Sequence, residues 1–296
     1  MCREVAGRAT SADDATAPAG CKTDYGKAQD LMELIRFNYC YSSISYHKVI
    51  PLTFLQIMNN NLTNKVAYIT GGSKGIGYGV AKTLLQSGMR VAITSRNLQA
   101  AEVAAASLSP DTSKVLGLGS DVGSFASESA AVKAVLDHFG QLDVLVANAG
   151  VGHFAPIDSL TEEDWKATID TNLTGVFNSV KNCINALKTS SGYIITIASL
   201  AGTNFFEQAS AYNASKFGLV GFTQAVMLDL RKYGIKVTTI MPGSVATEFA
   251  DHTPSDADAW KIRPEDIGKL VLDLLTMHPR TLPSKIEVRP LKPGKG

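Results

Sequence analysis

From residue 58 onward, short runs of β-branched and apolar residues alternate with longer alanine-rich segments. The short runs have the length of buried strands, and the longer segments place apolar residues at helical spacing. This alternation is typical of βαβ units and a parallel sheet. Seven strands are expected, at residues 65–70, 90–94, 115–119, 142–147, 193–198, 236–241 and 285–288. Helices are expected at residues 77–87, 124–139, 161–187, 211–233 and 264–277.

The order of these elements predicts an α/β fold with one doubly wound sheet. Right-handed crossovers between parallel strands place helices on both faces of the sheet. We expect a seven-stranded parallel sheet in the order 3-2-1-4-5-6-7, formed by a single domain over residues 58–296. In such sheets, ligands bind in the crevice beyond the carboxyl ends of the strands. The loops that follow the strands are therefore the place to look for functional residues.

Residues 1–57 do not share this regular pattern. They contain three of the four cysteines and a start rich in Ser, Ala and Thr, while Met58 stands shortly before the first expected strand. We interpret residues 1–57 as an artefact of the assigned start, with translation beginning at Met58, or as a disordered tail. A docking or targeting segment is the alternative.

Charge and composition exclude several classes of partner. The 28 Lys and Arg residues against 27 Asp and Glu residues leave a net charge of +1, without the basic excess that nucleic-acid binding requires. No apolar run reaches the ~18 to 20 residues of a membrane-spanning helix, so no membrane partner is expected. The cysteines form no CxxC pair and the histidines show no paired ligand spacing, which disfavours a disulfide scaffold and a metal site. A reducing, cytoplasmic location is expected.

A glycine-rich loop joins the first expected strand to the first expected helix. It reads Thr-Gly-Gly-Ser-Lys-Gly-Ile-Gly over residues 70–77. Glycine permits the tight turn and lets the backbone approach a ligand without an intervening Cβ. The N-terminus of the helix then faces a phosphate group. The loop predicts a nucleotide site that includes Gly71, Ser73, Gly75 and Gly77.

Tyr212 and Lys216 stand four residues apart in a helical segment, so both side chains project from one face. A free tyrosine has a pKa of about 10, and its use as a base near neutral pH requires a shift of about 3 units, or ~4 kcal/mol. A cation about 4 Å away supplies up to ~4 kcal/mol at an effective dielectric constant of ~20. We therefore expect Lys216 to lower the pKa of Tyr212.

Several motifs occur together in one order: the glycine loop, Asn148-Ala149-Gly150, Asn172, Ser199, Tyr212 with Lys216, and Pro242-Gly243 with Thr247. In this combination the chain resembles the short-chain dehydrogenase/reductases over residues 64–290. The resemblance implies a Rossmann fold, a nicotinamide cofactor, and hydride transfer between a carbonyl and a secondary alcohol.

The resemblance also implies a role for each residue of the catalytic group. Tyr212 would exchange a proton with the substrate oxygen, Ser199 would hold that oxygen, Lys216 would hold the nicotinamide ribose, and Asn172 would bind the water of a proton relay. The expected cofactor-binding residues are Gly71, Ser73, Lys74, Gly75, Ile76, Gly77, Ser95, Arg96, Asp121, Val122, Asn148, Ala149, Gly150, Tyr212, Lys216, Pro242, Gly243, Val245 and Thr247.

The end of the second expected strand bears on the choice of cofactor. It reads Thr-Ser-Arg-Asn over residues 94–97, without the carboxylate that usually binds the ribose 2′-hydroxyl of NAD. Arg96 and Lys74 are expected to clamp the 2′-phosphate of NADP(H), with a preference of roughly ten- to a hundredfold over NAD. Two solvated surface cations are the alternative interpretation.

The substrate is less well defined by the sequence. The loop after the sixth expected strand, residues 248–263, is short and polar, which predicts an open pocket for a small carbonyl or alcohol. The candidate residues for the walls of this pocket are His153, Phe154, Phe205, Phe206 and Trp260. A ketone, aldehyde or 3-hydroxy acid is the favoured substrate type. A 3-oxoacyl-carrier-protein reductase and a non-catalytic NADP-binding sensor are the alternatives. By resemblance, residues 161–187 and 211–233 would pair in a homodimer or homotetramer.

Overall fold

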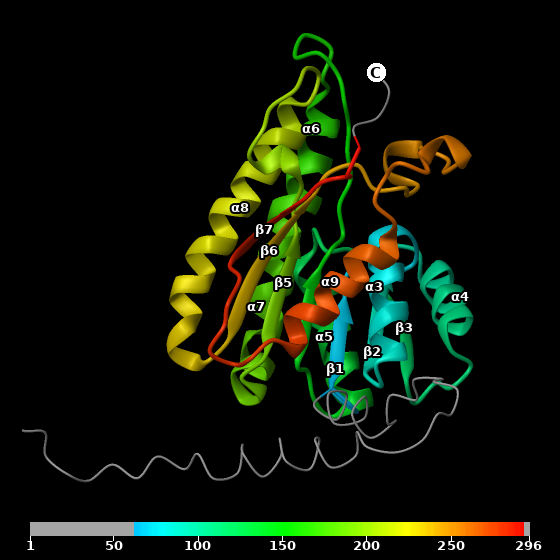
Figure 1. Cartoon of the computed structure of the whole chain (residues 1–296), viewed down its shortest axis with the longest axis vertical. Helices are drawn as coiled ribbons and strands as arrows, with labels where there is room; N and C mark the ends of the chain where they lie inside the picture. Colours follow the sequence, from blue (N-terminus) through cyan, green and yellow to red (C-terminus); the bar gives the residue numbers. More distant parts are fainter. Residues whose placement is uncertain (1–61, 293–296) are drawn as a thin grey trace, which may run out of the picture. The chain divides into compact units, whose positions relative to one another are not determined.

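Seven parallel strands form one sheet in the order β3-β2-β1-β4-β5-β6-β7, which confirms the expected fold (Figure 1). The structure is a computed structural model and describes residues 62–292, so the interpretation of residues 1–57 falls outside the described residues. The strands are β1 (Val66–Ile69), β2 (Arg90–Ser95), β3 (Val115–Gly119), β4 (Val144–Ala147), β5 (Tyr193–Ile197), β6 (Lys236–Pro242) and β7 (Lys285–Val288). Each lies within two residues of its expected bounds.

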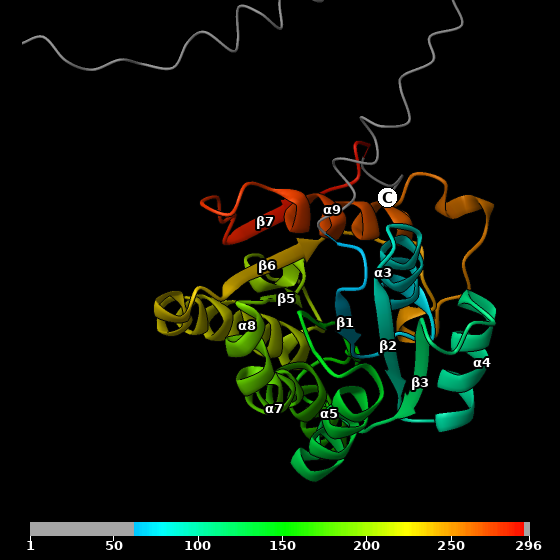
Figure 2. The same ribbon diagram turned by 90° about the horizontal axis from the view of Figure 1, so that it is seen from below.

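Helices cover both faces of the sheet (Figure 2). They are α3 (Gly75–Gln86), α4 (Leu98–Leu108), α5 (Phe125–Phe139), α6 (Glu162–Ile169), α7 (Gly175–Ser190), α8 (Ser210–Leu230) and α9 (Pro264–Thr276). One buried apolar cluster joins the sheet to α3, α4 and α9. A second cluster joins the other face to α5, α7 and α8. Among residues 62–292, no helix combines the length and apolar character needed to cross a membrane.

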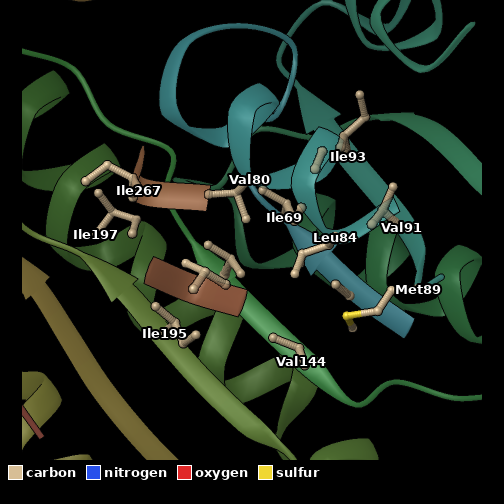
Figure 3. Close-up of a cluster of buried hydrophobic side chains, with 14 of the residues drawn as sticks. Ile69, Val80, Leu84, Met89, Val91, Ile93, Val144, Ile195, Ile197 and Ile267 are labelled. Atoms are coloured by element: carbon tan, nitrogen blue, oxygen red, sulfur yellow. The ribbon is translucent and has the colours of Figure 1, made fainter. Parts of the chain in front are cut away.

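The alternation of side chains along β1 shows how the sheet feeds both clusters. Ala67 and Ile69 belong to the cluster under α3 and α9, while Val66 and Tyr68 belong to the opposite one. All of β1 is buried, because successive side chains in a strand point to opposite faces and both faces are covered. Figure 3 shows part of the first cluster, with Ile69 and Leu84 packed between strand and helix.

Two helical segments differ from expectation. Helix α4 was not among the helices expected from the sequence. Its N-terminal cap is Asn97, whose side chain accepts a hydrogen bond from the Ala100 amide at 3.2 Å. The single helix expected at residues 161–187 is divided into α6 and α7 by a π-helical turn at Asp170–Thr174. This turn holds Asn172, whose buried amide side chain accepts from the Val151 amide and donates to the Val151 carbonyl, in the loop after β4.

Candidate active site

The loops after β1, β2, β3, β4, β5 and β6 meet around a cavity of about 450 Å³. This is the position that a doubly wound parallel sheet predicts for a ligand. The predicted residues that line it are Gly71, Ser73, Lys74, Gly75, Ile76, Ser95, Arg96, Asp121, Val122, Asn148, Ala149, Gly150, Ser199, Tyr212, Lys216, Pro242, Gly243, Val245 and Thr247. Gly77 and Asn172 do not line the cavity; both are buried beside it.

The backbone of the glycine loop leaves room for a ligand and none for added side chains. Gly71 and Gly75 have φ angles of 65° and 57°, a region that glycine adopts without strain. A Cβ at Gly77 would lie 2.5 Å from the Asn148 Nδ2 atom and from the Gly71 carbonyl oxygen. Helix α3 begins at Gly75, and its first turn carries no acidic side chain. The loop and helix N-terminus therefore fit the diphosphate of a dinucleotide.

Thr70 and Asn148 join the loop after β1 to the loop after β4. The Thr70 hydroxyl accepts from the amides of Asn148 and Ala149, both at 3.0 Å. The Asn148 Nδ2 atom donates to the carbonyls of Thr70 and Gly71, at 2.9 and 3.0 Å. Sequence reasoning did not assign Thr70 a role, although a hydroxyl at the end of a buried strand was the available signal. These hydrogen bonds hold the two loops against each other, and both loops line the cavity.

Helix α8 carries Tyr212 and Lys216 into the cavity. The Lys216 Nζ atom lies 5.6 Å from the centre of the Tyr212 ring and donates to the Ile197 carbonyl at 3.2 Å. Burial lowers the pKa of Lys216 to about 8. Burial also raises the pKa of Tyr212, and a hydrogen bond with Ser199 opposes that rise. In the chain alone, the expected lowering of the Tyr212 pKa is therefore wrong, because desolvation of the phenolate by burial outweighs the hydrogen bond with Ser199.

Asn172 lies behind the catalytic group rather than within the cavity. Its Nδ2 atom donates to the Ser215 hydroxyl at 3.0 Å, and that hydroxyl donates to the Tyr212 carbonyl at 2.8 Å. Its Oδ1 atom accepts from the Val151 amide at 2.8 Å. A Cβ at Gly150 would lie 3.2 Å from the Asn172 Oδ1 atom and 3.7 Å from the Lys216 Nζ atom. Asn172 and Lys216 thus flank the same glycine.

The two expected clamp residues both line the cavity. Lys74 precedes α3, and Arg96 follows β2, which places them on neighbouring loops. Both side chains are exposed, and within residues 62–292 neither forms an ion pair. The acidic residues that line the cavity are Asp121 and Glu248. The Asp121 side chain accepts from the Gly123 amide at 3.0 Å, a bond that holds the loop after β3.

The aromatic wall differs from the one expected. The Tyr212 ring lies 5.3 Å from the Phe154 ring and 5.7 Å from the Phe249 ring. Phe249 lines the cavity but was not among the expected wall residues, because its contact with Tyr212 is visible only in three dimensions. Phe205 instead stacks on Phe217 at 5.7 Å and is largely exposed. The position of Phe205 excludes it from the walls of the described cavities.

The remaining expected wall residues separate into two groups. The His153 Nδ1 atom lies 3.2 Å from the Asp164 carboxylate, at the surface. Phe206 and Trp260 line a second cavity next to the first. Of the five expected wall residues, Phe206 and Trp260 line a described cavity and Phe154 contacts the Tyr212 ring, while a role in substrate binding stays a prediction.

The loop after β6 is held more firmly than its polar sequence suggests. The Asp258 carboxylate is buried. It accepts a hydrogen bond from the Lys261 Nζ atom at 2.6 Å and lies 2.7 Å from the His252 Nε2 atom, within hydrogen-bond distance. These partners and the Ser255 amide hold the pKa of the Asp258 carboxyl well below its usual range. His252 and Lys261 both line the first cavity. Ion pairing therefore holds the loop that carries two of the residues lining the cavity.

Residues 65–258 match the family described as short chain dehydrogenase. The match covers more than half of the chain, so the chain belongs to the short-chain dehydrogenase family. It is accordingly an oxidoreductase of a family that binds NAD(P)(H) and acts on small molecules.

Relatives of known name are 35–38% identical to the chain over the residues that match. D-threitol dehydrogenase of Mycolicibacterium smegmatis is 38% identical over 189 residues, which are 64% of this chain and 73% of that protein. A 3-oxoacyl-[acyl-carrier-protein] reductase of Chlamydia muridarum is 37% identical over 194 residues, 65% of this chain and 78% of that protein. A glycine betaine reductase of Emericella nidulans is 35% identical over 213 residues, and the match spans 72% of this chain but 17% of that protein.

Solved structures show the same fold with either form of the cofactor. An alcohol dehydrogenase of Thermococcus sibiricus, complexed with 5-hydroxy-NADP, has a TM-score of 0.73 and 28% identity, over 77% of this chain and 97% of that one. A 3-ketoacyl-(acyl-carrier-protein) reductase of Brucella melitensis, complexed with NADH, has a TM-score of 0.71 and 26% identity, over 77% and 98%.

Proposed function

We propose that the chain is an NADP(H)-dependent oxidoreductase that interconverts a carbonyl and a secondary alcohol, with Tyr212 as the general acid and base. A ketone, aldehyde or 3-hydroxy acid is the proposed substrate type. The observation that carries the proposal is the convergence of Ser199, Tyr212 and Lys216 on the cavity that the glycine loop also lines. Phenol, hydroxyl and ammonium side chains beside a phosphate-binding loop suit proton exchange with an oxygen during hydride transfer.

The residues of the cavity have distinct tasks in this proposal. The bound cofactor would supply the hydride for the carbonyl carbon. Tyr212 donates its phenolic proton to the substrate oxygen, and the raised pKa of Tyr212 keeps that proton in place near neutral pH. Ser199 holds the oxygen by a hydrogen bond. Lys216, with its pKa of about 8, is mostly protonated at neutral pH and stabilises negative charge that develops on the Tyr212 oxygen.

NADP(H) is the proposed form of the cofactor. Lys74 and Arg96 line one cavity from two neighbouring loops, and within residues 62–292 neither side chain forms an ion pair that would compete with a 2′-phosphate. Arginine binds phosphate with two parallel hydrogen bonds, whereas lysine acts as a point charge. A preference of roughly ten- to a hundredfold for NADP(H) is consistent with two partly screened, charge-assisted bonds.

The test is consumption of NADPH, followed at its absorbance band, with a panel of aldehydes, diketones, 3-oxo esters and sugars. Turnover of a carbonyl compound that is lost in Tyr212→Phe supports the proposal. Absence of turnover across the panel, combined with tight NADPH binding, contradicts it and favours a non-catalytic NADP-binding sensor.

A 3-oxoacyl thioester is a second candidate substrate, favoured by the likeness to the Chlamydia muridarum reductase. Comparing kcat/KM for a 3-oxoacyl pantetheine thioester with kcat/KM for the corresponding methyl ester distinguishes a thioester reductase from a general carbonyl reductase. A large preference for the thioester would assign the chain to fatty-acid synthesis.

The proposal includes a homodimer or homotetramer that pairs through α7 and α8. Phe177, Phe217 and Leu228 on these helices are exposed apolar residues, which supports a surface that another copy covers. Sedimentation of the purified chain would test this assembly. A cytoplasmic location is also proposed and rests on the cysteine content of the sequence.

A further inference from the structure

A second cavity, of about 560 Å³, adjoins the first one. The two share Ser199, Gly243 and Ser244 in their linings. The glycine loop and the Lys74 and Arg96 side chains line the first cavity and not the second. The second cavity therefore includes the proposed oxygen-binding hydroxyl but none of the groups assigned to the phosphates of the cofactor.

The second cavity is built on the segment that follows β7. Arg289, Pro290 and Lys292 line it. The Gly243 amide donates to the Val288 carbonyl at 2.7 Å, which ties the end of β7 to the loop after β6. A Cβ at Gly243 would lie 3.2 Å from the Pro290 ring, so the chain after β7 packs directly on this loop. β7 runs beside β6 in the same direction (Figure 1), and its carboxyl end lies at the edge where the ligand crevice forms.

The lining combines apolar surface with positive charge. Phe206, Trp260 and Leu200 provide the apolar part, and Arg289 and Lys292 provide the two cations. Within the described residues, no acidic side chain lines this cavity.

One acidic residue outside the lining contacts Arg289. The Arg289 Nη2 atom donates to the Glu287 carboxylate at 2.9 Å. A guanidinium has five donors, so this bond leaves several for a ligand.

We propose that the second cavity binds an anionic group of the substrate, so that the substrate is a carbonyl or hydroxy compound that carries a carboxylate or a phosphate. This inference rests on the proposed function, because Ser199 marks where the reacting oxygen would lie. Arg289 and Lys292 pair with the anion, and Phe206 and Trp260 pack against the carbon chain. The two cations have no task in holding the cofactor, since neither lines the first cavity.

Direct binding tests the inference without catalysis. The chain has two tryptophans, so Trp165→Phe leaves Trp260 as the reporter in the cavity. We would titrate this variant with 4-nitrobenzoate and with 4-nitrobenzamide, which differ in charge, and follow quenching of Trp260 fluorescence. The expected result is quenching by the carboxylate at a concentration roughly tenfold or more below that of the amide.

Two further variants identify the residues responsible. The double substitution Arg289→Gln and Lys292→Gln should abolish the difference between the two probes. Lys285→Gln removes a cation from the same β7 segment, outside the cavity lining, and should preserve the difference. Equal quenching by both probes in the parent, or a difference that survives the double substitution, would overturn the inference.

Turnover separates this inference from the proposed function. With NADPH, we would compare levulinate with methyl levulinate, and dihydroxyacetone phosphate with dihydroxyacetone. Roughly tenfold faster reduction of an anionic member supports the inference, and the faster pair distinguishes carboxylate from phosphate. Reduction of the neutral members at equal or higher rates overturns the inference and retains the proposed function. Absence of turnover with all four, combined with selective quenching by the carboxylate probe, retains the anion site and contradicts the proposed function.

Discussion

The Lys216 Nζ atom lies 5.6 Å from the centre of the Tyr212 ring, and its hydrogen bond goes to the Ile197 carbonyl at 3.2 Å. Both side chains are buried, which lowers the pKa of Lys216 to about 8 and raises the pKa of Tyr212. Burial thus favours the neutral form of each group. In the chain alone, a protonated phenol stands beside an amine that titrates just above neutral pH.

The pH dependence of carbonyl reduction should follow Lys216. Above a pH of about 8 the amine loses its proton, and with it the positive charge that stabilises the phenolate left after proton donation. Tyr212 keeps its own proton through this range because its pKa is raised. We therefore expect kcat/KM for reduction at saturating NADPH to fall as the pH rises through about 8. A profile that stays flat to about pH 10 would contradict the assignment.

Replacement of Lys216 by Met should increase stability while it reduces activity. The pKa of Lys216 falls from 10.5 to about 8 on folding, so folding releases a proton between those values. The unfolded chain binds more protons there, and the unfolding free energy of the parent rises with pH across that window. At pH 7 the buried charge costs up to about 3 kcal/mol. Urea unfolding should show Lys216→Met more stable at pH 7, with the difference shrinking as the pH approaches 10.5.

Tyr212→Phe removes one hydroxyl from the cavity and leaves the ring contacts with Phe154 and Phe249. Loss of a general acid typically costs about 10²- to 10⁴-fold in rate, and we expect kcat to fall by that amount. The Kd for NADPH, measured by fluorescence titration, should change little. Retention of the parental kcat would exclude Tyr212 as the proton donor.

Gly77→Ala should weaken cofactor binding, because the new methyl would lie 2.5 Å from both the Asn148 side chain and the Gly71 carbonyl. The loop must shift to make room, and we expect the Kd for NADPH to rise roughly tenfold or more. Gly221→Ala is the matched control, because apart from the adjacent backbone of its own helix its Cβ meets no atom of residues 62–292 within 4 Å. In the interior of α8, that substitution should stabilise the fold by up to about 1 kcal/mol and leave the Kd unchanged. Similar effects from both variants would contradict the role of close packing at Gly77.

Arg96→Asp should change the choice of cofactor. The carboxylate repels a 2′-phosphate and can accept a hydrogen bond from a 2′-hydroxyl. We expect kcat/KM for NADPH to fall roughly ten- to a hundredfold, with a much smaller change for NADH. Initial rates with both cofactors and one carbonyl substrate provide the measurement. Equal losses with both would refute the clamp.

The sheet was predictable because its buried parallel strands appear in the sequence as short apolar runs. β3 and β7, for example, have the bounds that their sequence patterns predict. Many residues of the candidate site were predictable for a related reason, since they stand in the loops directly after those strands.

The remaining features depend on tertiary packing. The π-helical turn at Asp170–Thr174 replaces part of one expected helix, because Asn172 forms its bonds with residues distant in sequence. Phe249 contacts Tyr212 through a loop whose path sequence alone does not define. The direction of the Tyr212 pKa shift depends on burial, which spacing along a helix does not reveal.

In the part of the chain that the structure describes, β7 pairs only with β6 and so lies at one edge of the sheet. The residues that follow β7 can therefore be substituted without repacking the interior of the sheet. The hydrogen bond from the Gly243 amide to the Val288 carbonyl keeps these residues next to the second cavity. If the anion site is as proposed, substitutions in this C-terminal segment can change which substrates bind, while the glycine-rich loop and the loop after β2, where Lys74 and Arg96 lie, stay unchanged.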